Sequence, residues 1–256
     1  MKKLFTPFEE IGKTKERIII SFWLISIIFF WIFCSFSETN MFPTPSQVLQ
    51  GFVNIWNDGL MNHLQSSISL CLTAVLYSTV ISLFIVYISN LPAIKPLGKF
   101  VSILRYLPLT GISFYITILV DDARTIQTWV LVMFMSTYLI TSLLQMIKDI
   151  PEEEFQHART LGCNRWEILW EVVIKGRFDY VIELIRQNIA IVWMFLVSIE
   201  SILVAAGGLG VLIKNHDRLG KNGDVIAAQI LIIIIGLGLD YIFTKTRKLL
   251  FRYSNY

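Results

Sequence analysis

The sequence has little charge and few cysteines or histidines. Charged residues make up 16% of its 256 residues and hydrophobic residues 55%, whereas soluble domains carry roughly 25% charge. No pair among the three cysteines has metal-ligand spacing, and the three histidines lie far apart in the chain. This composition excludes a soluble globular protein, and it argues against a disulfide framework and a metal site. The small net charge of +3 requires no nucleic acid as a partner.

The chain also lacks a phosphate-binding loop. Its glycine-rich stretch AAGGLGVLIKN, residues 205–215, does not fit the pattern G-x-x-x-x-G-K-[ST], and no other stretch fits it. The adjacent pair Asp121 and Asp122 lies in a short loop beside Arg124, where we expect a solvated pair and no acid–base site. We therefore expect no bound cofactor and no catalytic residue, and any nucleotide hydrolysis has to come from a partner.

What the sequence does contain is a series of long hydrophobic runs. Since about 20 apolar residues cross a bilayer as a helix, the runs predict six spans. These lie near 18–37, 64–89, 98–120, 126–147, 182–205 and 225–245. The predicted fold is an all-α polytopic membrane protein, with a segment 1–17, a transmembrane domain 18–250 and a tail 251–256. The first run has no cleavage site after it and is expected to stay as an anchor.

The distribution of basic residues predicts the orientation. Of the 22 Lys and Arg residues, 18 fall in segments that the six spans place on one side of the membrane. The other four are Arg124, Lys214, Arg218 and Lys221. Because loops rich in Lys and Arg stay in the cytoplasm, both termini are expected to be cytoplasmic.

A charged insert, residues 149–175, separates the fourth and fifth runs. Asp149 before Pro151 and Glu152 predicts the start of a helix. Gly162 is expected to end that helix in a left-handed conformation, and Asn164 with Glu167 predicts the cap of a second helix.

The apolar residues of the insert form one stripe at helical spacing. It runs through Phe155, Ala158, Gly162, Trp166, Leu169 and Val173. This stripe fits two arrangements equally well from the residues alone: docking on a partner protein, or a helix lying flat at the lipid headgroups.

Charged residues inside the predicted spans are functional candidates. Glu200 costs free energy in mid-span unless it is paired or solvated, so it either lines a pathway or bonds internally to Ser198, Ser201 or a neighbouring helix. The spacing of Glu183 and Arg186 predicts an ion pair within one helix. Pro108 predicts a kink in the third span.

Several stretches together resemble the permeases of binding-protein-dependent ABC transporters. PEEEFQHARTLGCNRWEILWEVV resembles their E-A-A-x-x-x-G loop, with Gln156 and His157 in place of Glu and Ala. PTPSQVL, LRYLP, RQNIAIVWMFLVSIES and GGLGVLI resemble further stretches of the nitrate, sulfonate and taurine subfamily. The resemblance covers about 40 to 250 of the sequence. Lys175 and Asp179 depart from it, because the subfamily has prolines there, and VDDAR at 120–124 replaces a glycine-containing stretch.

The resemblance implies a fold of the type I importer class and a role in ATP-driven import of a small solute in the bacterial cytoplasmic membrane. It also implies cytoplasmic ATPase subunits, a second permease copy, an extracytoplasmic binding protein and membrane lipid as partners. The residues it implies for ATPase contact are Phe155, Gln156, His157, Ala158, Arg159, Leu161, Gly162, Arg165 and Trp166. The pathway candidates are Glu200, Arg105, Pro108 and Trp193.

Two other classes of function stay open. A membrane-embedded enzyme would need a cluster of catalytic residues, which the sequence does not contain. A permease-like scaffold or regulator without transport is the alternative favoured by the altered loop motif and the missing prolines.

Overall fold

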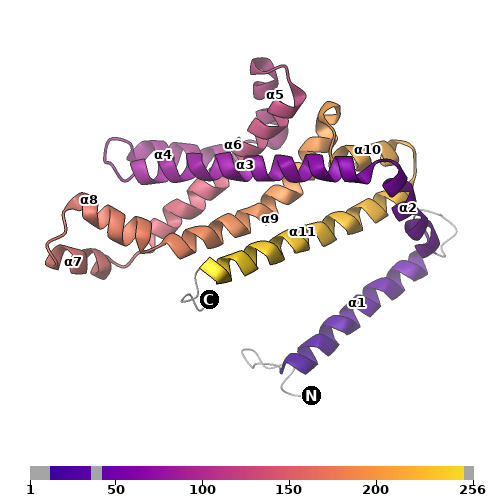
Figure 1. Ribbon diagram of the computed structural model, residues 1–256, viewed down its shortest axis with the longest axis horizontal. Helices are drawn as coiled ribbons and strands as arrows, with labels where there is room; N and C mark the ends of the chain where they lie inside the picture. The colour runs from indigo at the N-terminus through magenta and orange to yellow at the C-terminus, as the bar shows by residue number, and fades with distance from the viewer. Residues whose placement is uncertain (1–11, 36–41, 251–256) are drawn as a thin grey trace.

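The computed structural model of the protein describes residues 12–35 and 42–250, and every regular element in this part of the chain is a helix (Figure 1). The long helices are α1 (Lys13–Ser35), α3 (Leu60–Ile88), α6 (Ala123–Lys148), α9 (Phe178–Ile202) and α11 (Asn222–Leu250). The shorter ones are α2 (Pro45–Asn57), α4 (Lys95–Ile103), α5 (Leu109–Leu119), α7 (Glu152–Thr160), α8 (Arg165–Ile168) and α10 (Leu209–Arg218). The predicted all-α class is confirmed.

The five long helices are each long and apolar enough to cross a membrane. They correspond to five of the six predicted spans, with ends that differ by a few residues; positions 36–37 of the first span lie outside the described residues. The chain is a multi-pass membrane protein. Helices α2 and α10 were not predicted, because they are short and amphipathic and lie between apolar runs.

The third predicted span, 98–120, was wrong as one helix. It consists of Lys95–Tyr106 and Thr110–Leu119, which meet at 111°. Proline disfavours the helical conformation of the residue before it, and Leu107 is extended with ψ of 129°. Pro108 thus lies at the break as predicted, but it separates two helices. Neither is long enough to cross the bilayer alone.

Helix α6 forms the centre of the molecule and packs against both α3 and α9. Its packing on α3 uses small polar residues, since Ser78 and Ser82 are buried at that contact and bond to Met135 and to the Ser136 carbonyl. Small residues allow membrane helices to approach closely.

The two ends of this bundle differ (Figure 1). Helices α7 and α8 lie together at one end, called here the insert end, and α2 and α10 lie at the other, the α10 end. Helix α1 stands apart from the others over most of its length and is almost wholly exposed in the single chain.

Helix α2 is attached tightly to α11. It begins with a capping box in which Thr44 and Gln47 bond to each other's backbone N–H. A Cβ at Gly51 would lie 2.8 Å from the Gly223 carbonyl oxygen. Only glycine therefore allows the two backbones to approach this closely.

Candidate functional site

The insert folds into two helices that meet at Gly162, as predicted. Gly162 has φ of +82°, its N–H donates to the Arg159 carbonyl at 3.0 Å, and the Cys163 N–H donates to the Ala158 carbonyl at 3.1 Å. These two bonds form a Schellman motif, which uses the carbonyls left free at the end of α7. The Asn164 side chain then caps α8, and Glu167 bonds back to the Asn164 N–H at 2.7 Å.

The predicted cap at the start of the insert was wrong. Asp149 ends α6 and accepts a hydrogen bond from the Gln145 side chain at 2.8 Å, while Pro151 precedes α7. No side chain caps α7. Three glutamates in its first turn, Glu152, Glu153 and Glu154, instead place negative charge at the positive end of the helix dipole.

The insert connects to α9 without the prolines that the nitrate, sulfonate and taurine subfamily has there. Leu169–Lys175 forms a π-helix that continues α8 and ends at Gly176, whose N–H donates to the Glu171 carbonyl at 3.0 Å. A Cβ at Gly176 would lie 2.6 Å from the Val172 carbonyl oxygen, so glycine is required at this turn. The π-helix and Gly176 thus form the connection from the insert to α9.

The apolar stripe of the insert is divided between inside and outside. Ala158 is only 7% exposed, and Ile168 and Val173 are also buried against the chain itself. Phe155 is half-buried and lines a cavity of about 380 Å³. Trp166 lines the same cavity but is 67% exposed, and Leu161 and Trp170 are 71% and 53% exposed. A single partner-facing stripe including Ala158 was therefore wrong.

The polar residues expected in the insert, Gln156, His157, Arg159 and Arg165, are all exposed. Arg159 pairs weakly with Glu152 at 3.4 Å. Arg177, after the insert, pairs with Glu154 at 2.5 Å. The second pair connects α7 to the residue that precedes α9.

At the α10 end, Glu200 is fully buried in the last turn of α9 and not at mid-span. Its carboxylate accepts hydrogen bonds from the Ser67 hydroxyl at 2.7 and 2.9 Å and from the Gly210 N–H at 2.9 Å. Of the partners considered from the sequence, a neighbouring helix therefore provides the bonds. The Ser198 and Ser201 hydroxyls donate instead to backbone carbonyls of α9.

Cationic and small residues complete this junction. Arg124 attracts the Glu200 carboxylate electrostatically and donates to the Ser66 carbonyl at 2.5 Å. His63 Nδ1 accepts from the Gly208 N–H at 3.2 Å. Gly208 has φ of +119°, and a Cβ there would lie 2.1 Å from Glu200 Cδ. Because Gly208 has no side chain to cap α10, the Glu200 carboxylate serves the start of that helix instead.

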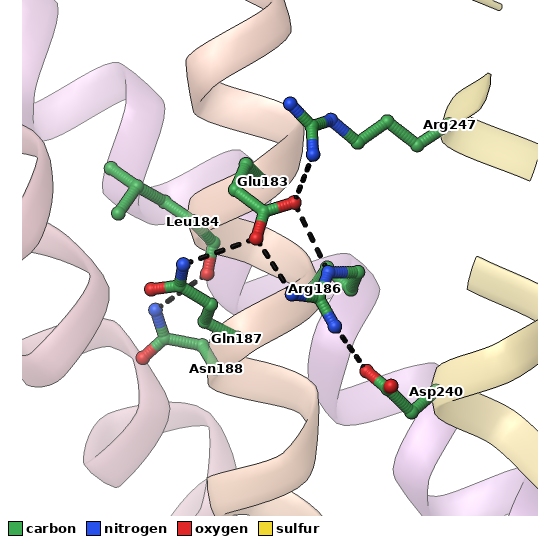
Figure 2. Close-up of polar contacts among 7 residues, drawn as sticks. All are labelled: Glu183, Leu184, Arg186, Gln187, Asn188, Asp240 and Arg247. Carbon is green, nitrogen blue, oxygen red and sulfur yellow. Dashed lines mark hydrogen bonds and ion pairs between the residues drawn. The ribbon is translucent and has the colours of Figure 1, made fainter. Parts of the chain in front are cut away.

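The predicted ion pair between Glu183 and Arg186 is present and is part of a larger cluster (Figure 2). Arg186 also pairs with Asp240, and Arg247 pairs with Glu183 at 2.6 Å. Sequence reasoning missed both residues of α11, because the pairing joins positions 54 and 64 residues apart.

The three histidines, His63, His157 and His216, belong to α3, α7 and α10. His216 is buried between two carboxylates, 3.3 Å from Asp58 and 3.0 Å from Asp224. Within the described residues, no group of three His, Cys, Asp or Glu side chains could hold a metal ion.

No family model matches the chain. In sequence it is 32% identical over 102 residues to a protein of Methanocaldococcus jannaschii named as an ABC transporter permease, which covers 40% of this chain and 38% of that protein. It is 24% identical over 214 residues to the taurine transport system permease protein TauC of Escherichia coli, covering 77% and 74%. It is 28% identical over 150 residues to the nitrate import permease protein NrtB of Synechococcus elongatus, covering 57% and 53%. Two of these three relatives are thus matched over less than two thirds of their length.

The comparison with solved structures agrees with the sequence comparison. A structure of the MetNI methionine ABC transporter in an inward-facing conformation has a TM-score of 0.63 at 13% identity, covering 74% of this chain and 95% of that one. The crystal structure of an amino acid ABC transporter has a TM-score of 0.62 at 16% identity, covering 79% and 97%. This chain is thus similar in sequence to permease proteins of taurine and nitrate transport systems, and in fold to solved ABC transporters. The predicted family resemblance and fold class are confirmed.

The four pathway candidates lie in different parts of this permease fold. Arg105 donates to the Tyr106 hydroxyl at 3.0 Å near the break before Pro108. Trp193 is buried in α9 and donates to the Ile232 carbonyl of α11 at 3.1 Å. Glu200 bonds to α3 and α10. No contact among the described residues unites them, so a shared pathway stays a hypothesis.

Proposed function

We propose that this chain is the transmembrane subunit of an ATP-driven ABC importer in a bacterial cytoplasmic membrane. ATP hydrolysis takes place in a separate subunit. The names of the relatives support this proposal, because they are permease proteins of taurine, nitrate and bicarbonate transport systems. The same names support a small solute of the nitrate, sulfonate or taurine type as the substrate.

The outward-facing apolar residues of the insert are the observation that carries the proposal. Leu161, Trp166 and Trp170 are exposed at the insert end of the bundle, on a segment otherwise rich in charge. Exposed large apolar side chains rimmed by polar ones mark protein-binding surfaces. We assign this surface, through Gly162 and its flanking helices, to the cytoplasmic ATPase subunit.

The remaining partners follow from the same assignment. The split of 18 basic residues to four supports cytoplasmic termini and a cytoplasmic insert end. The α10 end then faces outward, where an extracytoplasmic binding protein delivers the solute. A second copy of the chain completes the membrane part.

The test is reconstitution with the ATPase and binding protein of the same transport system. Trp166→Glu should lower ATPase co-purification by about tenfold, as expected for a buried aromatic contact. Trp56→Glu is the matched control, because Trp56 is similarly exposed, 63% against 67%, but lies on α2 at the opposite end. Undiminished binding in Trp166→Glu would contradict the docking assignment. A stable complex of the unaltered chain that never takes up solute would favour the scaffold alternative.

A further inference from the structure

A trough runs along the contact between α9 and α11. It consists of two adjoining cavities of about 410 and 500 Å³, and Arg186 lines both. The first is apolar over most of its length, with Trp193, Met194 and Leu237 among its lining residues. The second is polar and lies toward the C-terminal end of α11, where Tyr180, Arg247 and Lys248 line it. The trough is therefore apolar in one half and cationic in the other.

The cationic half has donors that the protein itself does not use. All three guanidinium nitrogens of Arg186 are engaged, two by Glu183 and one by Asp240 (Figure 2). Arg247 uses only Nη1, which donates to Glu183 at 2.6 Å. Lys248 is exposed and forms no ion pair within the described part of the chain. Arg247 and Lys248 can thus accept an anionic ligand without breaking an existing pair.

The charges leave room for one negative group. Three cations, Arg186, Arg247 and Lys248, line the trough with two carboxylates, those of Glu183 and Asp240. One positive charge is left over, which matches the single negative charge of a phosphodiester. Tyr180 adds a hydroxyl at the same end.

The dimensions fit one leaflet of a bilayer. From Arg186 to Met194, eight positions further along α9, the helix advances about 12 Å, and half of a hydrocarbon core is about 15 Å thick. Beyond Arg186, every α9 residue that lines the first cavity is uncharged. A polar solute would lose its hydration there without gaining partners, whereas an acyl chain would not.

We propose that this trough binds one anionic phospholipid, with its phosphate at Arg247 and Lys248 and an acyl chain against Trp193. The inference does not depend on transport, since it concerns the lipid-level surface of the chain alone. Its failure would leave the proposed importer role unaffected.

Native mass spectrometry of the full-length protein in detergent tests the headgroup half. We expect one phosphatidylglycerol to bind about tenfold more tightly than phosphatidylcholine, equivalent to about 1.4 kcal/mol. Lys248→Gln should remove most of this preference, and Arg247→Gln with Lys248→Gln should abolish it. Lys245→Gln is the matched control, because Lys245 is an exposed cation of α11 outside the trough lining. A preference that survives in Lys248→Gln and in the double variant overturns the proposal.

A second pair of variants tests the acyl half. Ala190 is an exposed residue of the apolar lining, and Ala190→Trp should fill the trough and weaken phosphatidylglycerol binding several-fold. Gly238→Trp adds similar bulk on α11 where a Cβ would meet nothing within 4 Å, and it should bind as the unaltered chain does. Displacement of the lipid by millimolar inorganic phosphate would show a phosphate site and overturn the proposal. Disulfide cross-linking of two copies through Leu237→Cys, with no lipid retained, would assign the trough to a second copy.

Discussion

The Ser67 hydroxyl donates to both carboxylate oxygens of Glu200, at 2.7 and 2.9 Å, across 133 residues of sequence. Ser67 also accepts from the Leu209 N–H at 2.9 Å, so one hydroxyl connects α3, α9 and the start of α10. A buried carboxylate that is fully hydrogen-bonded costs far less than an isolated one. The bonding explains why the fold tolerates Glu200 and gives this residue a structural role beside the hypothesis that it lines a pathway.

Glu200→Gln should therefore lower stability. The amide retains one acceptor oxygen but turns an NH₂ group toward the Ser67 hydroxyl or the Gly210 N–H, at a cost of about 1–3 kcal/mol. Ser67→Ala should cost less, because Gly210 still bonds to Glu200. Ser69→Ala, at an exposed position of α3, is the control. Thermal unfolding of the purified variants measures the effect. An unchanged unfolding midpoint with altered solute uptake would favour the pathway hypothesis over the structural role.

The His216 contact offers a second stability test. Asp224 is only 4% exposed, accepts from the Asn54 side chain at 3.1 Å, and faces His216 at 3.0 Å without the alignment of a hydrogen bond. His216→Leu leaves this carboxylate buried beside an apolar group, which should destabilise the chain by about 3 kcal/mol. Lys214→Leu removes the exposed pair with Asp217 on the same helix and should cost under about 1 kcal/mol. Equal losses in the two variants would contradict a special role for His216.

Asp122 predicts a dependence on pH. Its carboxylate accepts from the Thr125 hydroxyl and N–H at the start of α6, and these bonds hold the pKa of Asp122 below its usual range. A lowered pKa means that the stabilisation is present at neutral pH and is lost as the pH falls below about 3.9 toward the folded-state value. Asp122→Asn keeps a capping oxygen but does not titrate.

The wild-type unfolding midpoint should consequently fall more than that of Asp122→Asn between neutral pH and about pH 3. Asp121→Asn is the control, since Asp121 is exposed and does not cap a helix. A difference between wild type and Asp122→Asn that stays constant over this range would contradict the capping account. The prediction that Asp121 and Asp122 are solvated is thus correct, since both are exposed. It did not include the capping of α6 by Asp122.

Local signals predicted the insert better than its surroundings. Gly162, Asn164 and Glu167 act on neighbours within five residues, so their pattern determined the corner and the second cap. Asp149 failed because the same residue type can end one helix or begin the next, and a short spacing does not distinguish the two.

Long-range packing was beyond prediction from one sequence. The stripe through Phe155 and Trp166 was recognised, but which residues face the chain itself depends on the position of the loop near Pro92, far away in sequence. The pairing of Arg186 with Asp240 and of Glu200 with Ser67 depends on helix neighbours in the same way. Hydropathy identified the long helices, because a long apolar run in a bilayer has to form a helix to satisfy its own backbone hydrogen bonds. It missed α2 and α10, because neither is apolar enough.

Gly162→Val tests the corner of the insert most directly. A Cβ at Gly162 meets nothing within 4 Å, so the substitution causes no clash and its cost comes from the φ of +82° alone. A β-branched residue in the left-handed region is strained by about 1–3 kcal/mol, which the chain can relieve only by rotating α7 relative to α8. This rotation would change the positions of Leu161 and Trp166 relative to each other and so alter the surface assigned to the ATPase.

The membrane helices should not respond, because a Cβ at Gly162 would meet nothing within 4 Å. We therefore expect Gly162→Val to reach the membrane at normal levels but to co-purify with the ATPase about tenfold less well. Gly162→Asn is the matched control, since asparagine tolerates the left-handed conformation, and it should retain most of the binding. If valine binds the ATPase as well as asparagine does, the angle between α7 and α8 does not matter for docking, and a flat arrangement at the lipid headgroups becomes the better account of the insert.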